Sequence, residues 1–144
     1  GGGINSPIEL ELNPVEIGKG RVMNIRDSDM LVLNFGALIK TADEVAQELN
    51  ATLLDMRFVK PLDKKLIAEH SIKKEAIVTI EDGAISGGAG SAVSEWAQEN
   101  KMKQQIIICG IPDQFIDHAS RTEMLEMTGL DKEGILAKVK DCLS

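Results

Sequence analysis

The chain has 144 residues, a length that fits one compact domain and leaves no room for two substantial ones. Hydrophobic residues make up 43% of it and charged residues 27%. This composition excludes disordered and fibrous proteins, because enough apolar surface is present to offset the entropy of the chain. The formal charge of -7, with scattered Lys and Arg, argues against a nucleic-acid-binding protein.

The sequence also indicates a cellular compartment. No stretch approaches the roughly 20 apolar residues of a membrane span, and the start has no signal-peptide pattern. Cys109 and Cys142 lie far apart and have no C-x-x-C spacing, which predicts reduced, partly buried thiols rather than a disulfide. We therefore expect a cytoplasmic protein.

The first twenty residues predict a linker. They are rich in Gly, Pro and Asn turn residues, apart from the short apolar alternation Ile8–Leu12. The opening Gly1–Gly3 fits a junction to an upstream segment and a remnant of expression equally well. We divide the chain into an interdomain linker over residues 1–20 and a domain over residues 21–144.

Five segments of the domain have strand-like patterns: Arg21–Ile25, Met30–Phe35, Ala51–Met56, Ala76–Ile80 and Ile106–Cys109. Met30–Phe35 is nearly continuous in apolar residues, as in strands of a parallel sheet that are covered on both faces. Arg21–Ile25 is amphipathic, and it is the best candidate for an antiparallel edge strand.

Helical periodicity appears between and after these strands. Four segments place apolar residues on one helical face: Ala42–Leu49, the segment around Leu66 and Ile67, Ala89–Ala97, and Ile135–Leu143. Thr41, three residues before Glu44, forms a capping box that predicts the first helix start. Pro61–Asp63 and Asp131 predict the starts of the second and the last helix.

The order of these elements predicts the fold. Strands that alternate with helices indicate parallel βαβ units. We expect an α/β three-layer open sheet of about five strands, mostly parallel with one antiparallel edge strand, and helices on both faces. A second capping box, formed by Ser120 and Glu123, and a C-cap glycine, Gly129, follow the last strand.

A glycine-rich loop, Gly87–Ser91, lies between a strand and a helix, where free amides could hold an anion. It matches neither the Walker loop nor G-x-G-x-x-G, because the last position of the second motif is Val93. The neighbouring Glu81 and Asp82 would disfavour phosphate. We expect that the small residues instead let the helix pack closely on the sheet.

Titratable residues give weak indications of chemistry. Glu81–Asp82 ends a strand, but adjacent side chains on an extended chain point to opposite faces, so capping or hydrogen bonding to the glycine loop is favoured. Asp113, Asp117 and His118 suggest a base or a metal ligand but fall below the usual ligand count. His70 suits the end of a helix. We assign no catalytic, cofactor-binding or metal-binding residue in this chain.

One segment carries a family resemblance. Asp55–Asp63 resembles the D-x-R-x-x-x-P-L-D motif in the C-terminal domain of transketolase-like thiamine diphosphate enzymes. With Phe58–Lys60 included, it is similar to the 1-deoxy-D-xylulose-5-phosphate synthase family. Supporting matches follow in the same order as in the family: Gly18–Gly20, Leu33–Gly36, Leu49–Thr52, Glu81–Gly83 with Gly87–Ser91, Ile111–Asp113 with Phe115, and Gly129–Asp131.

The resemblance implies a parent enzyme of three domains that condenses pyruvate with D-glyceraldehyde 3-phosphate and releases carbon dioxide. The product, 1-deoxy-D-xylulose 5-phosphate, supplies isoprenoid, thiamine and pyridoxal biosynthesis. The parent would be a cytoplasmic homodimer with thiamine diphosphate and Mg²⁺. In the family, the cofactor and the catalytic His and Glu residues belong to the first two domains. This chain resembles the third domain, with a break before Gly1.

We therefore expect this chain by itself to be inactive, to hold no cofactor and to have the other two domains as its partners. Ala119 departs from the family, where Gly often follows the residue equivalent to His118, and this leaves the role of His118 open. Two alternatives remain. One is the corresponding domain of a transketolase or of a 2-oxoacid dehydrogenase β subunit. The other is a free-standing regulatory module that binds a ligand at Gly87–Ser91.

Overall fold

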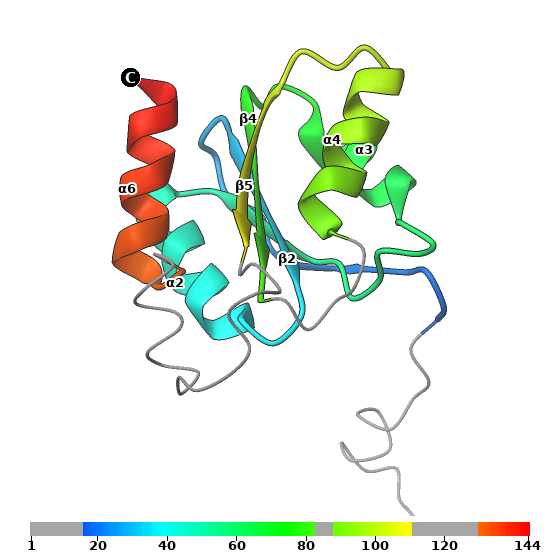
Figure 1. The fold of residues 1–144 in the computed structure, drawn as a ribbon, viewed down its shortest axis with the longest axis horizontal. Helices are drawn as coiled ribbons and strands as arrows, with labels where there is room; N and C mark the ends of the chain where they lie inside the picture. The colour runs from blue at the N-terminus through cyan, green and yellow to red at the C-terminus, as the bar shows by residue number, and fades with distance from the viewer. Residues whose placement is uncertain (1–15, 83–87, 111–129) are drawn as a thin grey trace, which may run out of the picture.

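The structure, a computed structural model, describes residues 16–82, 88–110 and 130–144 (Figure 1). Five strands form one sheet in the order β1-β3-β2-β4-β5. Their bounds are β1 Arg21–Asn24, β2 Met30–Phe35, β3 Thr52–Asp55, β4 Ala76–Glu81 and β5 Gln105–Gly110. The helices are α2 Ile39–Leu49, α3 Lys64–Ser71, α4 Ala89–Glu99 and α6 Lys132–Leu143. None of these described helices is long and apolar enough to cross a membrane.

The sheet is mostly parallel, as the sequence predicts. Strands β3, β2, β4 and β5 run parallel to one another, and β1 pairs antiparallel with β3 at one edge. The expected antiparallel edge strand is therefore confirmed. Within the described chain, all five predicted strands and all four predicted helices are present, with bounds that differ from the predicted ones by at most three residues.

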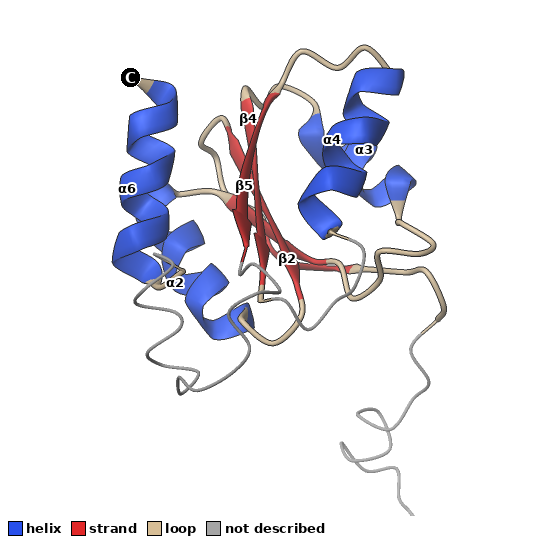
Figure 2. Ribbon diagram, in the orientation of Figure 1, coloured by secondary structure: helices blue, strands red, loops and turns tan. Residues whose placement is uncertain are grey.

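Two layers of helices sandwich this sheet. Helices α2 and α6 cover one face and α3 and α4 cover the other (Figure 2). Side chains alternate across a strand, so β2 sends Val32 to the first face, and Leu31 and Leu33 to the second. Every residue of β4 is buried. This explains why the central strands are apolar at successive positions rather than at alternate ones.

Helix starts were predicted correctly where an aspartate caps the helix. The side chain of Asp63 accepts a hydrogen bond at the start of α3, and that of Asp131 accepts one at the start of α6. The helix start predicted from the capping box at Thr41 was wrong, since α2 already begins at Ile39. The residue before it, Leu38, has no side-chain cap but is buried in the core, so tertiary packing sets this helix start.

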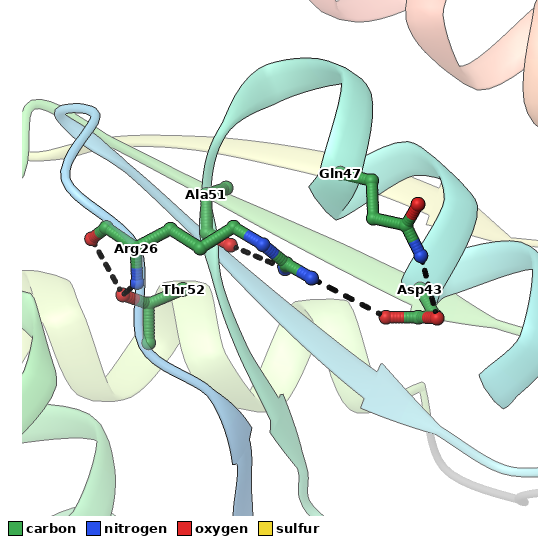
Figure 3. A network of polar contacts seen from close by, with 5 residues as sticks. All are labelled: Arg26, Asp43, Gln47, Ala51 and Thr52. Carbon is green, nitrogen blue, oxygen red and sulfur yellow. Dashed lines mark hydrogen bonds and ion pairs between the residues drawn. The ribbon is translucent and has the colours of Figure 1, made fainter.

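A polar network ties the β1–β2 turn to the amino end of the sheet (Figure 3). The Arg26 amide donates to Thr52 Oγ1, and the Thr52 hydroxyl donates back to the Arg26 carbonyl. The Arg26 guanidinium donates to the Ala51 carbonyl and lies 3.7 Å from Asp43 Oδ1. Gln47 also donates to Asp43. These contacts at the amino end of the sheet are therefore structural.

Candidate functional site at the carboxyl edge of the sheet

The sheet topology places a switch point between β2 and β4. The chain leaves β2 towards β3 on one side and then crosses to β4 on the other side of β2. Ligands of open α/β sheets bind where such connections diverge, outside the carboxyl ends of the strands. Phe35 pairs with Glu81 at this end. Four polar residues lie near this point: Asn34, Asp55, Glu81 and Asp82. Each of them belongs to one of the segments that resemble the family.

Glu81 is engaged with the start of helix α4. Its carboxylate accepts hydrogen bonds from the Ala89 amide at 2.8 Å and the Gly90 amide at 3.0 Å, in a buried position. A carboxylate at a helix N-terminus is stabilised by the free amides and by the helix dipole. The predicted hydrogen bonding of Glu81 to the glycine loop is confirmed. These two amides already have an acceptor, so this helix start is poorly suited to an additional anion.

Close packing explains the small residues of the glycine loop. A Cβ atom at Gly90 would lie 2.4 Å from Ile108 Cγ2 and 2.9 Å from Thr79 Oγ1, so only glycine lets α4 approach the sheet this closely. Gly88, which precedes the helix, has a φ angle of +70°. The expected packing role is confirmed at Gly90. Gly87 lies outside the described residues.

Asp82 joins the two strands across the switch point. Its carboxylate accepts a hydrogen bond from the Ala37 amide at 2.9 Å, in the loop that follows β2. A Cβ atom at Gly36 would lie 2.7 Å from Asp82 Oδ1, and Gly36 has a φ angle of +105°. Asp82 therefore binds the connection that follows β2. It holds the β2 and β4 ends together.

A third polar group spans β1, β2 and β3. The side-chain amide of Asn34 donates through Nδ2 to Asp55 Oδ1 at 3.3 Å and to the Gly36 carbonyl at 3.1 Å. Arg21 lies 3.7 Å from the other Asp55 oxygen and is half exposed. Asn34 Oδ1 is buried and has no hydrogen-bond partner among the described residues. An Asn inside an otherwise apolar strand is a sequence signal for this group, although its partners are not predictable locally.

The P-L-D end of the family-like motif has a structural role. Asp63 Oδ1 accepts a hydrogen bond from the Leu66 amide at 3.2 Å, and Asp63 Oδ2 accepts one from the Gly20 amide at 2.9 Å. A Cβ atom at Gly18 would lie 2.5 Å from Pro61 Cγ. Two of the motif matches, Gly18–Gly20 and Asp55–Asp63, are therefore in contact.

A groove of about 580 Å³ opens beside this motif. One wall comes from Val59–Leu62 and Lys64, and the other from helix α4, which contributes Trp96, Glu95 and Glu99. The walls carry opposite charges, lysines on one side and glutamates on the other. Such mixed charges give no preference for an anionic or a cationic small molecule.

The thiols and the described histidine have no arrangement for catalysis. Both cysteines are free, as the sequence predicts; Cys109 is buried, but Cys142 is exposed rather than partly buried. Burial raises the pKa of Cys109 to about 11, against the opposing charge of Lys138. This thiol is therefore protonated at neutral pH and is a poor nucleophile. His70 lies in the last turn of α3, the predicted position.

Several candidates from the sequence lie outside the described residues. These are Asp113, Phe115, Asp117 and His118, together with Ser120, Glu123 and Gly129 of the second capping box and C-cap. Their predicted roles stay predictions. Among the described side chains, Asn34, Asp55, Glu81 and Asp82 each contact another part of this chain, while Asn34 Oδ1 and, on β4, Thr79 Oγ1 are buried without a hydrogen-bond partner.

Comparisons with known proteins agree with these observations. Residues 18–135 match the family model described as the transketolase C-terminal domain. The chain is similar to the 1-deoxy-D-xylulose-5-phosphate synthase of Pseudomonas fluorescens, with 44% identity over all of this chain and 23% of that protein. It is 45% identical to the Pseudomonas aeruginosa enzyme over 99% of this chain and 23% of that protein. The chain thus spans about a quarter of the length of these relatives.

A solved structure is similar as well. It is described as a split-gene transketolase in an inactive β4 tetramer. The TM-score is 0.75 at 28% sequence identity, and the match covers 88% of this chain and 43% of the other.

Proposed function

The chain belongs to the transketolase C-terminal domain family, and on this premise we propose that it forms the C-terminal domain of a 1-deoxy-D-xylulose-5-phosphate synthase. The observation that carries the proposal is the 44% identity to such a synthase across the whole chain, over 23% of that relative. The likeness to a transketolase is lower, at 28% identity. The Asp55–Asp63 motif supports the same choice.

The whole protein would be a transferase of isoprenoid, thiamine and pyridoxal biosynthesis. It would join the acyl group of pyruvate to D-glyceraldehyde 3-phosphate, with loss of carbon dioxide, to form 1-deoxy-D-xylulose 5-phosphate. Thiamine diphosphate with Mg²⁺ would stabilise the carbanion that decarboxylation leaves. We also propose that the whole enzyme is a cytoplasmic homodimer.

The residues described here do not fit the cofactor or its metal. No group of three or more His, Cys, Asp or Glu side chains in the described part of the chain could hold a metal ion. The carboxylates of Glu81 and Asp82 accept hydrogen bonds from backbone amides of this domain. Asp55 faces Asn34 and Arg21. We propose that this domain supplies packing and interdomain surface, and that the cofactor and the catalytic residues belong to other domains.

The test compares the protein encoded by the full-length reading frame with the 144-residue chain. The full-length protein should form 1-deoxy-D-xylulose 5-phosphate and carbon dioxide from pyruvate and D-glyceraldehyde 3-phosphate when thiamine diphosphate and Mg²⁺ are present. The 144-residue chain should give neither product and no calorimetric signal with the cofactor. Micromolar cofactor binding by the chain would contradict the proposed role of this domain. A full-length protein that is inactive on these substrates would contradict the synthase.

The structural likeness to a transketolase favours one alternative, the corresponding domain of a transketolase or of a 2-oxoacid dehydrogenase β subunit. The same full-length protein separates these cases by its substrates. A transketolase transfers a two-carbon unit from a ketose phosphate without releasing carbon dioxide. A 2-oxoacid dehydrogenase component instead transfers the acyl group to a lipoyl carrier.

A free-standing phosphate-binding module is less well supported. Its ligand would bind at Gly87–Ser91, where the carboxylate of Glu81 already occupies the amides of Ala89 and Gly90. Titration of the chain with phosphate-bearing metabolites, followed by NMR at Gly88–Ser91, tests this alternative. Saturable shifts at the Ala89 and Gly90 amides would support a module, and unchanged shifts would exclude it.

A further inference from the structure

Exposed apolar side chains gather along the first described part of the chain. Among the described residues, five large apolar side chains are exposed, and three of them lie close together in sequence: Ile17 at 79%, Val22 at 38% and Ile25 at 69%. The other two, Ile72 at 68% and Leu143 at 46%, stand singly at the ends of α3 and α6. Single exposed apolar residues are ordinary, whereas a row of three within residues 17–25 of the chain favours a contact surface.

The row follows the edge strand of the sheet. Strand β1 pairs with β3 on one side, and no strand of the described chain pairs with its other side. Met23 packs against the core, which anchors the strand, while Val22 lies half exposed. An uncovered edge strand with apolar side chains is an aggregation risk that proteins reduce by covering the edge. We name Ile17, Val22 and Ile25, with the outer edge of β1, the β1 surface.

We propose that the β1 surface is the docking site for the upstream domains of the same polypeptide, an inference that rests on the proposed function. The chain spans 23% of the length of its synthase relatives, so most of such a polypeptide lies outside this domain. The matched family is a C-terminal domain, so that remainder precedes the chain. The polypeptide that connects those upstream domains to this domain therefore arrives next to Ile17.

The chemistry of the surface suits this occupant. Interfaces between domains of one chain bury about 600–1,500 Å² and combine apolar with polar contacts. The β1 surface offers three apolar side chains beside the half-exposed Arg21, which is paired with Asp55. Upstream domains are tethered to this edge by the chain itself, and the high effective concentration that a short connection gives favours them over a separate partner.

Hydrogen exchange measured by mass spectrometry tests the proposal in the full-length protein. Peptides that cover residues 16–26 should exchange about tenfold more slowly in the full-length protein than in the 144-residue chain. The double variant Ile17→Glu/Ile25→Glu should remove this protection. The matched control Ile72→Glu/Leu143→Glu, at two exposed apolar positions elsewhere, should retain it.

Three results would overturn the proposal. Exchange over residues 16–26 could be equal in the two proteins, or the protection could survive Ile17→Glu/Ile25→Glu. The 144-residue chain could also sediment as a dimer with this region already protected, in which case a second copy covers the β1 surface. Activity of the full-length protein is measured separately. An inactive full-length protein would contradict the synthase, whereas unchanged hydrogen exchange would contradict the docking site.

Discussion

Glu81 supplies from within the chain the negative charge that the start of α4 requires. Its two oxygens satisfy two of the amides that a helix leaves free at its N-terminus. Glu81→Gln keeps the size of the side chain but directs an amide group towards a backbone donor. We expect a loss of about 1–3 kcal/mol in the free energy of unfolding, measured by urea denaturation.

The control for this variant lies on the same helix. Glu95 is exposed, and Glu95→Gln should change the free energy of unfolding by less than about 0.5 kcal/mol. Equal effects of the two substitutions would show that the Glu81 hydrogen bonds do not stabilise α4. The hydrogen bonding of Glu81 to the glycine loop was predictable because Glu81 ends a strand. Which two amides it binds was not predictable, because that depends on how the helix packs.

Cys109 makes stability depend on pH in the alkaline range. Burial raises its pKa from an ordinary value near 9 to about 11 in the folded state. Because the folded protein then binds more protons than the unfolded chain, this contribution is complete below pH 9. It is lost as the pH rises towards 11, by about 2–3 kcal/mol.

Urea denaturation at pH 8.5 and pH 10.5 measures this effect. The natural chain should lose more stability between these pH values than Cys109→Ala, which has no thiol to ionise at this position. The alanine variant is expected to be less stable at both pH values because it leaves a cavity, so the comparison uses the change with pH. Identical changes in the two proteins would contradict the raised pKa.

Asp63 connects two elements that are far apart in sequence. One oxygen caps α3 through Leu66, and the other accepts from the amide of Gly20, just before β1. Asp63→Asn retains an oxygen for the cap but presents an NH₂ group to the Gly20 amide. We expect a loss of about 1–2 kcal/mol for Asp63→Asn and about 2–3 kcal/mol for Asp63→Ala, which removes both contacts.

Hydrogen exchange separates the two contacts. The Gly20 amide should exchange faster in both Asp63 variants, whereas the Leu66 amide should lose protection in Asp63→Ala alone. Asp131→Asn is a suitable control, because the cap of α6 uses one oxygen of Asp131, which accepts a hydrogen bond from the Gly134 amide. An unchanged Gly20 amide in Asp63→Asn would contradict the proposed link between β1 and α3.

The elements themselves were predictable to different degrees, for physical reasons. Asp63 and Asp131 revealed their helix starts because capping is local in sequence. Thr41 did not, since burial of Leu38 sets the start of α2, and burial depends on the whole fold. The edge position of β1 could be predicted from its amphipathic pattern. The contact of Asp82 with Ala37 could not, because it joins residues 45 positions apart.

The carboxyl edge of the sheet has the topology of a ligand site but contains contacts that hold the domain together. Glu81 binds α4, Asp82 binds the loop after β2, and Asp55 binds Asn34. Among the described residues, these three carboxylates are thus engaged with the chain itself, while Asn34 Oδ1 is unpaired. The same architecture occurs in a transketolase structure, and we propose that the chemistry of the whole enzyme belongs to other domains.

The two halves of the core share one sheet, so we expect the domain to unfold as a single unit. Trp96, the sole tryptophan of the chain, packs in the cluster on the α3 and α4 face. Its fluorescence therefore reports on that face, while far-UV circular dichroism reports on the whole domain. The two urea transitions of the 144-residue chain should coincide, as two-state unfolding requires.

A substitution on the opposite face makes this test sharper. Val139 of α6 is buried in the cluster on the α2 and α6 face, and Val139→Ala should cost about 1–3 kcal/mol. If the sheet couples the two clusters, the Trp96 transition shifts to lower urea by as much as the circular dichroism transition, although Trp96 is in the other cluster. If only the circular dichroism transition moves, the faces unfold separately and each helical layer is an independent unit. We expect the common shift, because residues of each central strand contribute to both clusters, as Val32 and Leu33 do on β2. One cluster therefore cannot lose its strands while the other keeps them.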